Sequence, residues 1–334
     1  MKLFLAGDYW SNTGPANVTQ NLIQGSNPQI LYQKTRNKAL RTIEILYKTI
    51  RSHAVVYSGF SLQNLLGFKL AKWLHRPSFY LMHGSIHYES LINKQNVPDM
   101  IRQEADMLEM ADFILAVSKP FEAWLKKEYP QYANKIYTLT NGISWDMIPL
   151  SSTLDSKISG RILSVGGGVP IKNILTICKA INIIYQNTPD CAIQLIVLGA
   201  PGKDSNAINA FPFVKNYGLV SHEETLTYMN SAQLFIQNSS FETFGLAPIE
   251  ALLQGCSLLI SSHAGAISIF TDVHEEDIIF DPKDISELTK KILFILTNPN
   301  STRLLAGINP HTTSVEYRQT ELLSLVRELG SIKI

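Results

Sequence analysis

Short apolar runs alternate with longer amphipathic segments along almost the whole chain. Lys2–Ala6, Ala54–Tyr57 and Ser78–Met82 are examples of the short runs, and each precedes a segment whose apolar residues recur every three or four positions. Such alternation predicts βαβ units and therefore parallel sheets covered by helices. The pattern runs through the first half of the chain and starts again at Gly160. The sequence therefore predicts an α/β protein with two domains.

A polar, irregular stretch separates the two series of elements. Residues 144–158 show neither an apolar run typical of a strand nor the three-to-four-residue spacing typical of a helix. They are interpreted as an interdomain linker. We expect a first domain at residues 1–143, a second at residues 159–312 and a final helix within residues 313–334. A chain of 334 residues is long enough for two domains with ordinary cores.

Composition excludes several classes of protein. No apolar run approaches the roughly 18 residues of a membrane span, and Leu3–Ala6 is too short for a secretory signal. Cys178, Cys191 and Cys256 are odd in number and lack metal-ligand spacing, so we expect reduced core thiols in a cytoplasmic protein.

Charge is unevenly divided along the chain. Residues 1–150 carry 16 Lys and Arg against 11 Asp and Glu, a balance of +5, and the remainder carries 13 against 17, a balance of −4. The excess is too mild, and has too few interleaved aromatic residues, to indicate nucleic-acid binding.

The segment Lys34–Arg51 is a predicted helix with one basic and one apolar side. The basic side chains are those of Lys34, Lys38, Arg41 and Lys48, and the apolar ones are those of Leu40, Ile43, Leu46, Tyr47 and Ile50. Such a helix either packs on the sheet as a surface helix or lies on an anionic membrane surface.

The stretch Phe235–Ile260 carries the strongest chemical signal. It is typical of a strand, a loop, a helix that ends at Gly255 and a further strand. Glu242 lies in the loop and Glu250 in the helix, so both acids can face one ligand. A helix N-terminus offers N–H groups and a positive dipole end to a phosphate, and carboxylates can bind hydroxyl groups.

A glutamate early in a helix also has a structural explanation, because it interacts favourably with the helix dipole. Glu250, however, lies within the apolar run Ala247–Leu253, where an unpaired buried carboxylate is costly. The pair therefore indicates a ligand with a phosphate in the middle and a sugar at either end.

Other strand ends carry residues suited to the same ligand. Gly166–Gly168 follow a strand and precede Lys172 at a helix start, which suits a diphosphate cradle and is also compatible with a flexible turn. His83 follows the strand Ser78–Met82, where ligands of open α/β sheets bind. Gly14 lies in a strand-to-helix loop that allows close approach to phosphate, or is a plain turn.

Glu242 and Glu250, with Phe244-Gly245-Leu246 between them, resemble the E-x7-E signature of the retaining glycosyltransferases of family 4. The resemblance implies the GT-B fold, two Rossmann-like domains with parallel sheets facing a central cleft. It implies that Glu242 contacts the donor sugar and that Glu250 contacts the nucleotide ribose. The loop residues whose amides would meet the sugar and diphosphate are Thr243, Phe244, Gly245 and Leu246.

The same resemblance assigns roles elsewhere. His83 matches a histidine that contacts the donor sugar and contributes to catalysis. Lys172 matches a lysine on the diphosphate, and Val220 matches a position whose backbone reads the nucleobase edge. Gly14 and Gly166 match glycines of donor-binding loops.

Gly167 is included among the donor-binding residues but departs from the family, which has an arginine at this position. The diphosphate's second charged partner is therefore not identified by the resemblance. In GT-B proteins the last helix often crosses back to the first domain, which we expect for residues 313–334.

The resemblance implies a metal-independent transferase without a cofactor, and the chain has no D-x-D triplet. The expected donor is a nucleoside diphosphate hexose or N-acetylhexosamine, linked to UDP rather than GDP. The expected acceptor is a hydroxyl of a glycan, lipid-linked or protein-linked molecule in cell-surface polysaccharide or glycoconjugate synthesis. The expected location is the cytoplasm, with peripheral attachment at the inner face of the membrane.

Two alternatives stay open. One is another sugar-nucleotide enzyme of the same fold, such as a phosphorylase or an epimerase. The other is a non-catalytic subunit or lectin-like module that supports a partner transferase, and Gly167 is the feature that favours it.

Overall fold

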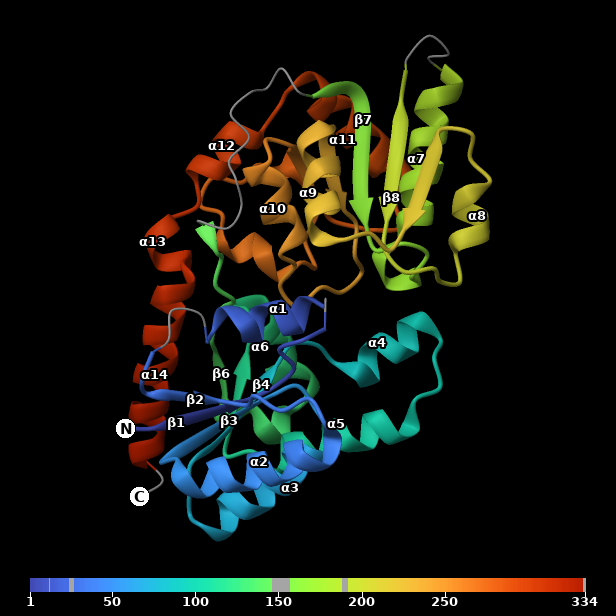
Figure 1. The fold of residues 1–334 in the computed structure, drawn as a ribbon. Helices are drawn as coiled ribbons and strands as arrows, with labels where there is room; N and C mark the ends of the chain where they lie inside the picture. The colour runs from blue at the N-terminus through green and yellow to red at the C-terminus, as the bar shows by residue number, and fades with distance from the viewer. Residues whose placement is uncertain (12, 24–26, 146–156, 188–191, 333–334) are drawn as a thin grey trace. The chain divides into compact units, whose positions relative to one another are not determined.

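The computed structural model describes residues 1–11, 13–23, 27–145, 157–187 and 192–332. The chain forms two units, each with its own parallel sheet (Figure 1). The first unit comprises Met1–Ser144 and Pro310–Ile334, and the second comprises Trp145–Asn309. Most of the predicted linker lies outside the described residues.

The first unit is built on a six-stranded sheet of order β2-β1-β3-β4-β5-β6, in which all neighbouring strands are parallel. Its strands are β1 (Leu3–Ala6), β2 (Ile30–Tyr32), β3 (Ala54–Ser58), β4 (Ser78–Met82), β5 (Phe113–Ala116) and β6 (Ile136–Thr138). Its α-helices are α1 (Gly14–Asn21), α2 (Lys38–Arg51), α3 (Leu62–Trp73), α4 (Ile86–Asn93), α5 (Pro98–Met110), α6 (Lys119–Glu128), α13 (Pro310–Thr313) and α14 (Val315–Ile332).

The second unit repeats this plan with the strand order β12-β11-β10-β7-β8-β9, again parallel throughout. Its strands are β7 (Ile158–Val165), β8 (Gln194–Leu198), β9 (Val214–Gly218), β10 (Ala232–Gln237), β11 (Ser257–Ser261) and β12 (Ile278–Ile279). Its α-helices are α7 (Ile174–Asn187), α8 (Ser205–Asn209), α9 (His222–Ser231), α10 (Ala247–Leu253), α11 (Ile285–Thr297) and α12 (Ser301–Ala306).

The central strands are apolar because helices bury them on both faces. Every residue of β1, β3 and β4 is buried, as is every residue of β11. Parallel strands buried on both faces lack the alternation of a half-exposed strand and instead read as continuous apolar runs. The two sheets predicted from these runs are present.

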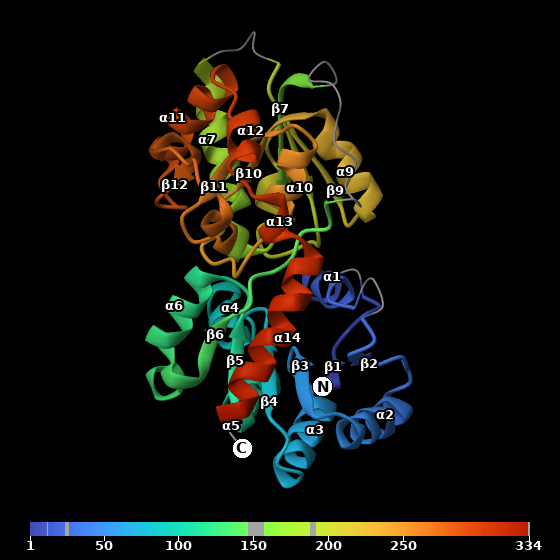
Figure 2. The ribbon, with the colours of Figure 1, turned by 90° about the vertical axis from the view of Figure 1, so that its left-hand side faces the viewer.

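The chain's last residues pack within the first unit (Figure 2). The N–H of Ile143 donates to the carbonyl of Thr313 at 2.8 Å, and Arg327 donates to the side chain of Gln29 at 2.8 Å. A Cβ on Gly142 would lie 2.8 Å from the Cα of Val315, so glycine is required where the end of β6 meets the start of α14. Among the described helices, none is both long and apolar enough to span a membrane.

Helix α2 differs from its prediction in length and in orientation. It begins at Lys38 rather than Lys34, because the Asn37 side chain accepts the N–H groups of Ala39 and Leu40 and so caps the helix. Of the two alternatives left open, packing of the apolar side chains on the sheet is wrong: Ile43, for example, is 64% exposed. Lys48 instead points inward and donates to the carbonyl of Tyr32.

Candidate active site

The predicted donor residues of the second unit lie beyond the carboxyl ends of adjacent strands. Gly166–Gly168 follow β7, and Glu242 lies five residues after the last residue of β10. Because β7 and β10 are neighbours in the parallel sheet, their following loops meet at the same edge. The structure therefore brings Lys172 and Glu242 together at this edge.

Glu242 and Lys172 form an ion pair with an Nζ–Oε2 distance of 2.5 Å. Both side chains are partly buried, 18% exposed for Glu242 and 28% for Lys172. The buried side chain of Gln237 donates to the same Oε2 atom at 2.9 Å. Sequence reasoning missed Gln237, although an amide at the end of the apolar strand β10 was a visible signal.

A short 3-10 turn, Pro170–Lys172, places the lysine. The next residue, Asn173, has φ +48 and donates from Nδ2 to the carbonyl of Asn238 and the hydroxyl of Ser240. The N–H of Ser240 returns a bond to the carbonyl of Ile171 at 2.9 Å. These bonds hold the Lys172 turn against the loop that carries Glu242. The two segments that carry the ion pair are therefore fixed relative to one another.

Glycine is needed in the loop after β7 for two different reasons. Gly166 has φ +147, and a Cβ there would lie 2.5 Å from Cγ of Lys172, so the lysine side chain runs across this glycine. Gly167 has φ +56, and its Cβ would lie 2.0 Å from the carbonyl oxygen of Ala200. A side chain at position 167, arginine included, does not fit this conformation.

The expected amide cradle in this loop is wrong for the conformation described. Gly166 and Gly167 both donate their N–H groups to the carbonyl of Leu198, and Gly168 donates to that of Ala200. These amides fix the loop against the end of β8 and so do not point at a ligand. Lys172 is the group in this segment that can meet a phosphate.

Glu250 lies in the first turn of α10 and has a different partner. Nε2 of His222 lies 3.0 Å from its Oε1 atom. The Glu250 side chain is only 15% exposed. The hydrogen bond that the His222 ring donates to Glu250 raises the pKa of His222 above its usual value, an effect that burial partly opposes. No motif pointed to His222, because its proximity to Glu250 arises only when α9 packs against α10.

The loop between the two acids is largely buried. Phe244 is 1% exposed and belongs to the core, its carbonyl accepts the N–H of Ala266 at 2.7 Å, and Thr243 is also buried. Gly245 has φ +90, a conformation that favours glycine. Leu246 precedes α10, and its carbonyl accepts the N–H groups of Ile249 and Glu250 at 3.0 Å, while Pro248 has no N–H group.

Val220 lies in the turn between β9 and α9 and is half-buried. Ser221 caps α9 reciprocally with Glu224: the Ser221 hydroxyl accepts the Glu224 N–H, and the Glu224 carboxylate accepts the Ser221 N–H. This capping box holds the Val220 backbone in place and sets His222 as the first residue of the helix.

In the first unit, His83 directly follows β4 and belongs to a chain of hydroxyl groups. Nε2 of His83 lies 2.7 Å from the Ser58 hydroxyl, which lies 2.8 Å from the hydroxyl of Thr19. Thr19 donates its only hydroxyl hydrogen to the carbonyl of Pro15. Ser58 must then donate to Thr19 and accept from His83, which assigns the ring hydrogen to Nε2. Burial lowers the pKa of His83 to about 4, so the ring is neutral at pH 7.

Gly7 and Gly14 differ in whether the fold requires a glycine at their position. A Cβ on Gly7 would lie 2.8 Å from Thr19 Cγ2 and 2.9 Å from Ser58 Cβ, so the hydroxyl chain requires glycine there. Gly14, the predicted donor-loop residue, is exposed at the start of α1 and has no atom within 4 Å of its Cβ position. The fold therefore does not demand glycine at position 14.

Glu104 of α5 is a buried acid that the sequence pattern did not single out. Its carboxylate accepts the N–H of Ile86 at 2.7 Å and lies within hydrogen-bond distance of the Ser85 hydroxyl, 3.3 Å away. Burial raises the pKa of Glu104 to about 6, against the opposing effect of these bonds. Glu104 thus holds the start of α4, just after His83.

The described residues contain no group of three or more His, Cys, Asp or Glu side chains arranged to hold a metal ion. Cys178 and Cys256 are free and buried, while Cys191 lies outside the described residues. Burial raises the pKa of both described thiols, to about 12 and about 11.

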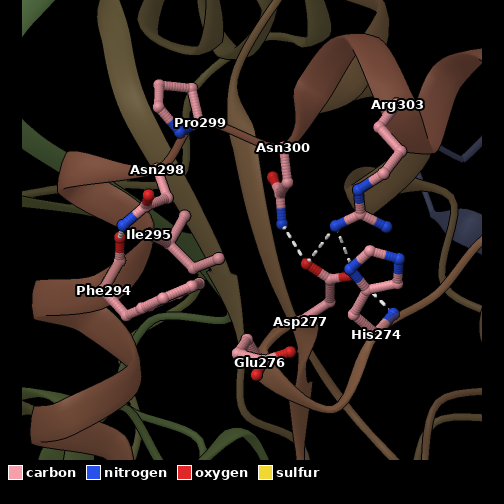
Figure 3. Close-up of a pocket in the computed structure, with 9 residues that line it drawn as sticks. All are labelled: His274, Glu276, Asp277, Phe294, Ile295, Asn298, Pro299, Asn300 and Arg303. Atoms are coloured by element: carbon pink, nitrogen blue, oxygen red, sulfur yellow. Dashed lines mark hydrogen bonds and ion pairs between the residues drawn. The ribbon is translucent and has the colours of Figure 1, made fainter.

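A separate pocket of about 270 Å³ lies beside the C-terminal end of α11 (Figure 3). Its buried acid, Asp277, receives two hydrogen bonds from Nη2 of Arg303 at 2.8 Å and one from Asn300 at 2.7 Å. The carboxylate is fully paired and ties β12 to α12. None of the predicted site residues lines this pocket.

The two six-stranded parallel sheets with their helices define a GT-B fold. A solved structure of HepE from Anabaena, in complex with UDP and glucose, superposes with a TM-score of 0.72 and covers 98% of this chain and 100% of its own, at 13% identity.

Sequence comparison finds similarity to glycosyltransferases. Residues 156–306 match the family model of glycosyl transferases group 1. The 2-deoxystreptamine N-acetyl-D-glucosaminyltransferase of Niallia circulans is 25% identical over 307 residues, which are 86% of this chain and 75% of the relative. The O-antigen chain mannosyltransferase B of Escherichia coli is 24% identical over 246 residues, 66% of this chain and 64% of the relative.

Proposed function

We propose that the protein transfers a hexose or N-acetylhexosamine from a nucleoside diphosphate sugar to a hydroxyl group, with retention of the anomeric configuration and without a metal ion. The observation that carries this proposal is the Lys172–Glu242 pair at the edge of the second sheet. It places a cation for a phosphate beside a carboxylate for sugar hydroxyls, within the residues that match the group 1 family model.

Each group has a distinct part in the proposed reaction. Lys172 stabilises the negative charge that develops on the leaving diphosphate, a kind of interaction that commonly contributes about 3 kcal/mol to lowering a barrier. Glu242 holds the hydroxyl groups of the donor sugar, and Glu250 holds the ribose diol. His83, neutral at pH 7, contacts the donor sugar as a hydrogen-bonding group rather than as a cation.

The remaining donor contacts come from the backbone. Val220 meets the nucleobase edge, and residues 243–246 offer amides before α10. Gly14, Gly166 and Gly167 contribute no side-chain groups and instead allow the backbone to approach the donor closely. The complex of HepE with UDP and glucose supports a UDP-linked donor for this chain.

The names of the relatives support the proposed substrate class. One is named a 2-deoxystreptamine N-acetyl-D-glucosaminyltransferase and the other an O-antigen chain mannosyltransferase B. We propose a glycan, lipid-linked or protein-linked acceptor in cell-surface polysaccharide or glycoconjugate synthesis. The proposed location is the cytoplasm, peripheral to the inner face of the membrane, with the segment Lys34–Arg51 facing the lipid.

The test begins with a panel of nucleotide sugars. A donor that binds should raise the melting temperature by mass action, and its turnover is then followed as release of the nucleoside diphosphate. Glu242→Gln should lower turnover at least 10²-fold, because a hydrogen-bonding charge at the donor sugar is lost while the shape is kept. Proton NMR of the product should show the donor's anomeric configuration.

Glu287→Gln is the matched control. Glu287 also lies in the second unit and pairs with a lysine, Lys291, at 2.8 Å, with both side chains 16% exposed. It belongs to α11 and is not a predicted site residue. Equal losses in the two variants would mean that Glu242 acts through stability alone, and near-normal turnover of Glu242→Gln would refute its role.

The second candidate is a non-catalytic subunit that supports a partner transferase. The observation in its favour is that position 167 has no room for the family's arginine. This candidate function predicts that the purified chain turns over no nucleotide sugar and that a partner chain binds to the purified chain.

A further inference from the structure

The solvent-facing side of α2 is apolar. Leu40, Ile43, Tyr47 and Ile50 are all more than half exposed. Their spacing of three, four and three residues places them in one stripe along the helix. The inward side carries Ile45 and Thr49, which are fully buried.

The neighbouring helix α3 adds to this stripe. Leu62, Leu66 and Trp73 are exposed, Trp73 to 75%, and all three lie on the side opposite the buried residues of the helix. Helices α2 and α3 lie side by side in both views of the first unit (Figures 1 and 2). We call the seven side chains the α2–α3 face: Leu40, Ile43, Tyr47, Ile50, Leu62, Leu66 and Trp73.

The surroundings of the α2–α3 face are strongly cationic. Residues 34–76 contain nine Lys and Arg and one acid, Glu44, a balance of +8, whereas the rest of the chain, with 20 against 27, has a balance of −7. The exposed cations of this segment are Lys34, Arg36, Lys38, Arg51, Lys69 and Lys72.

The single acid does not neutralise these exposed cations. Glu44 pairs with Lys48 at 2.6 Å and accepts the N–H groups of Lys34 and Thr35. Its charge is therefore held on the inward side. Arg51 lies over the ring of Tyr47, 5.8 Å from its centroid, so cationic and apolar groups adjoin on the outer side.

We propose that the α2–α3 face inserts into the surface of a bilayer that contains anionic lipid. Large exposed apolar patches mark interaction sites, and apolar side chains flanked by lysine and arginine are typical of helices that lie in the lipid interface. A second copy of the chain is disfavoured as the occupant, because the six exposed cations of the segment would then face the same cations of the other copy. The apolar side chains enter the acyl boundary, and the flanking cations meet lipid phosphates.

This inference rests on the proposed peripheral location but not on the proposed transfer reaction. Vesicle binding and sugar turnover can therefore fail separately. It also specifies the residues involved: attachment depends on the exposed apolar stripe and on Arg51, Lys69 and Lys72, and not on Lys48, which faces the protein.

The test measures binding of the full chain to vesicles of phosphatidylcholine alone and of phosphatidylcholine with about a third phosphatidylglycerol. We expect flotation with the anionic vesicles only, weakened by salt. Lipids brominated near the headgroup should quench tryptophan emission in the wild type, and this quenching should be largely lost in Trp73→Phe.

Two sets of variants separate the contributions. Arg51→Gln, Lys69→Gln and Lys72→Gln together should weaken binding roughly 100-fold, at about five-fold per charge. The control replaces three exposed lysines elsewhere, Lys127, Lys179 and Lys290, with Gln and should bind as the wild type does. Ile43→Ser with Trp73→Ser should weaken binding at least about 10-fold, whereas Leu293→Ser, which changes an exposed leucine of α11, should not.

Three results would overturn the proposal. The first is failure to bind anionic vesicles. The second is equal weakening by the control set, which would indicate unspecific charge attraction. The third is a concentration-dependent dimer in sedimentation velocity that Trp73→Ser abolishes, because the face would then be covered by a second copy. An unchanged melting temperature in every variant excludes misfolding as the cause.

Discussion

Gly167 is the position at which the sequence departs from the family pattern that it otherwise resembles, and the structure gives a reason. Gly167→Ala and Gly167→Arg should destabilise the second unit to a similar extent, because the obstacle is the Cβ atom that both share. That atom would lie 2.0 Å from the Ala200 carbonyl oxygen, on a residue whose φ is +56.

The magnitude follows from two contributions. A residue with a Cβ in the left-handed region costs about 1–2 kcal/mol. Relief of the contact must move the loop from β8, which endangers the 2.8 Å bond from Gly167 to Leu198 and the 3.2 Å bond from Gly168 to Ala200. At about 1 kcal/mol for each hydrogen bond, the total is roughly 3–4 kcal/mol. For a unit of this size, such a loss lowers the melting temperature by about 10 °C.

Gly218→Ala is the control that isolates the backbone contribution. Gly218 lies in the same unit with φ +69, and its Cβ position has no atom within 4 Å. Calorimetry should therefore show a drop of a few degrees for Gly218→Ala and a clearly larger one for Gly167→Ala. Equal drops would refute the packing argument. Tighter binding of a nucleotide sugar by Gly167→Arg would show that the loop opens to admit an arginine.

Two further predictions concern histidines. Burial lowers the pKa of His83 to about 4, so the stabilisation that goes with its neutral ring is present above pH 6.5 and is lost as the pH falls towards 4. In chemical denaturation the free energy of unfolding of the wild type should fall by at most about 3 kcal/mol over this pH range, and His83→Asn should lack this fall. An NMR titration that gives His83 an ordinary pKa would contradict the prediction. Glu250 raises the pKa of His222. Calorimetric binding of a nucleotide sugar should therefore strengthen as the pH rises from about 6 to about 8, where His222 releases Glu250, and His222→Ala should remove this dependence.

The parts of the fold that depend on local pattern were predictable from sequence. The apolar runs at β1, β3 and β4 predicted buried parallel strands, and Gly255, with φ +79, ends α10 as its position after the helix predicted. Side-chain partners brought together by tertiary packing were not predictable. His222 meets Glu250 across 28 residues, and Ser58 meets His83 across 25, so neither spacing forms a motif.

The orientation of α2 was not predictable for a different physical reason. An amphipathic pattern identifies two sides of a helix but not which one faces the core. In the structure Lys48 reaches the carbonyl of Tyr32 and pairs with Glu44, which satisfies the charged inward side. Inward polar groups with partners therefore leave the apolar stripe exposed, and an exposed stripe of this kind is informative about partners.

The ion pairs of the two predicted donor-binding acids also constrain how a donor binds. Both predicted donor-binding acids already have partners, Glu242 with Lys172 and Glu250 with His222. A diphosphate that attracts Lys172 must compete with Glu242 for it, and the carboxylate so released becomes available to sugar hydroxyls. Binding of the nucleotide and of the sugar would then be coupled through the broken Lys172–Glu242 pair. The diphosphate alone leaves Glu242 without a partner cation, and the sugar alone leaves Lys172 without a phosphate. Under this reasoning a free nucleoside diphosphate and a free sugar should each bind more weakly than their separate contact groups suggest, while the joined donor uses both.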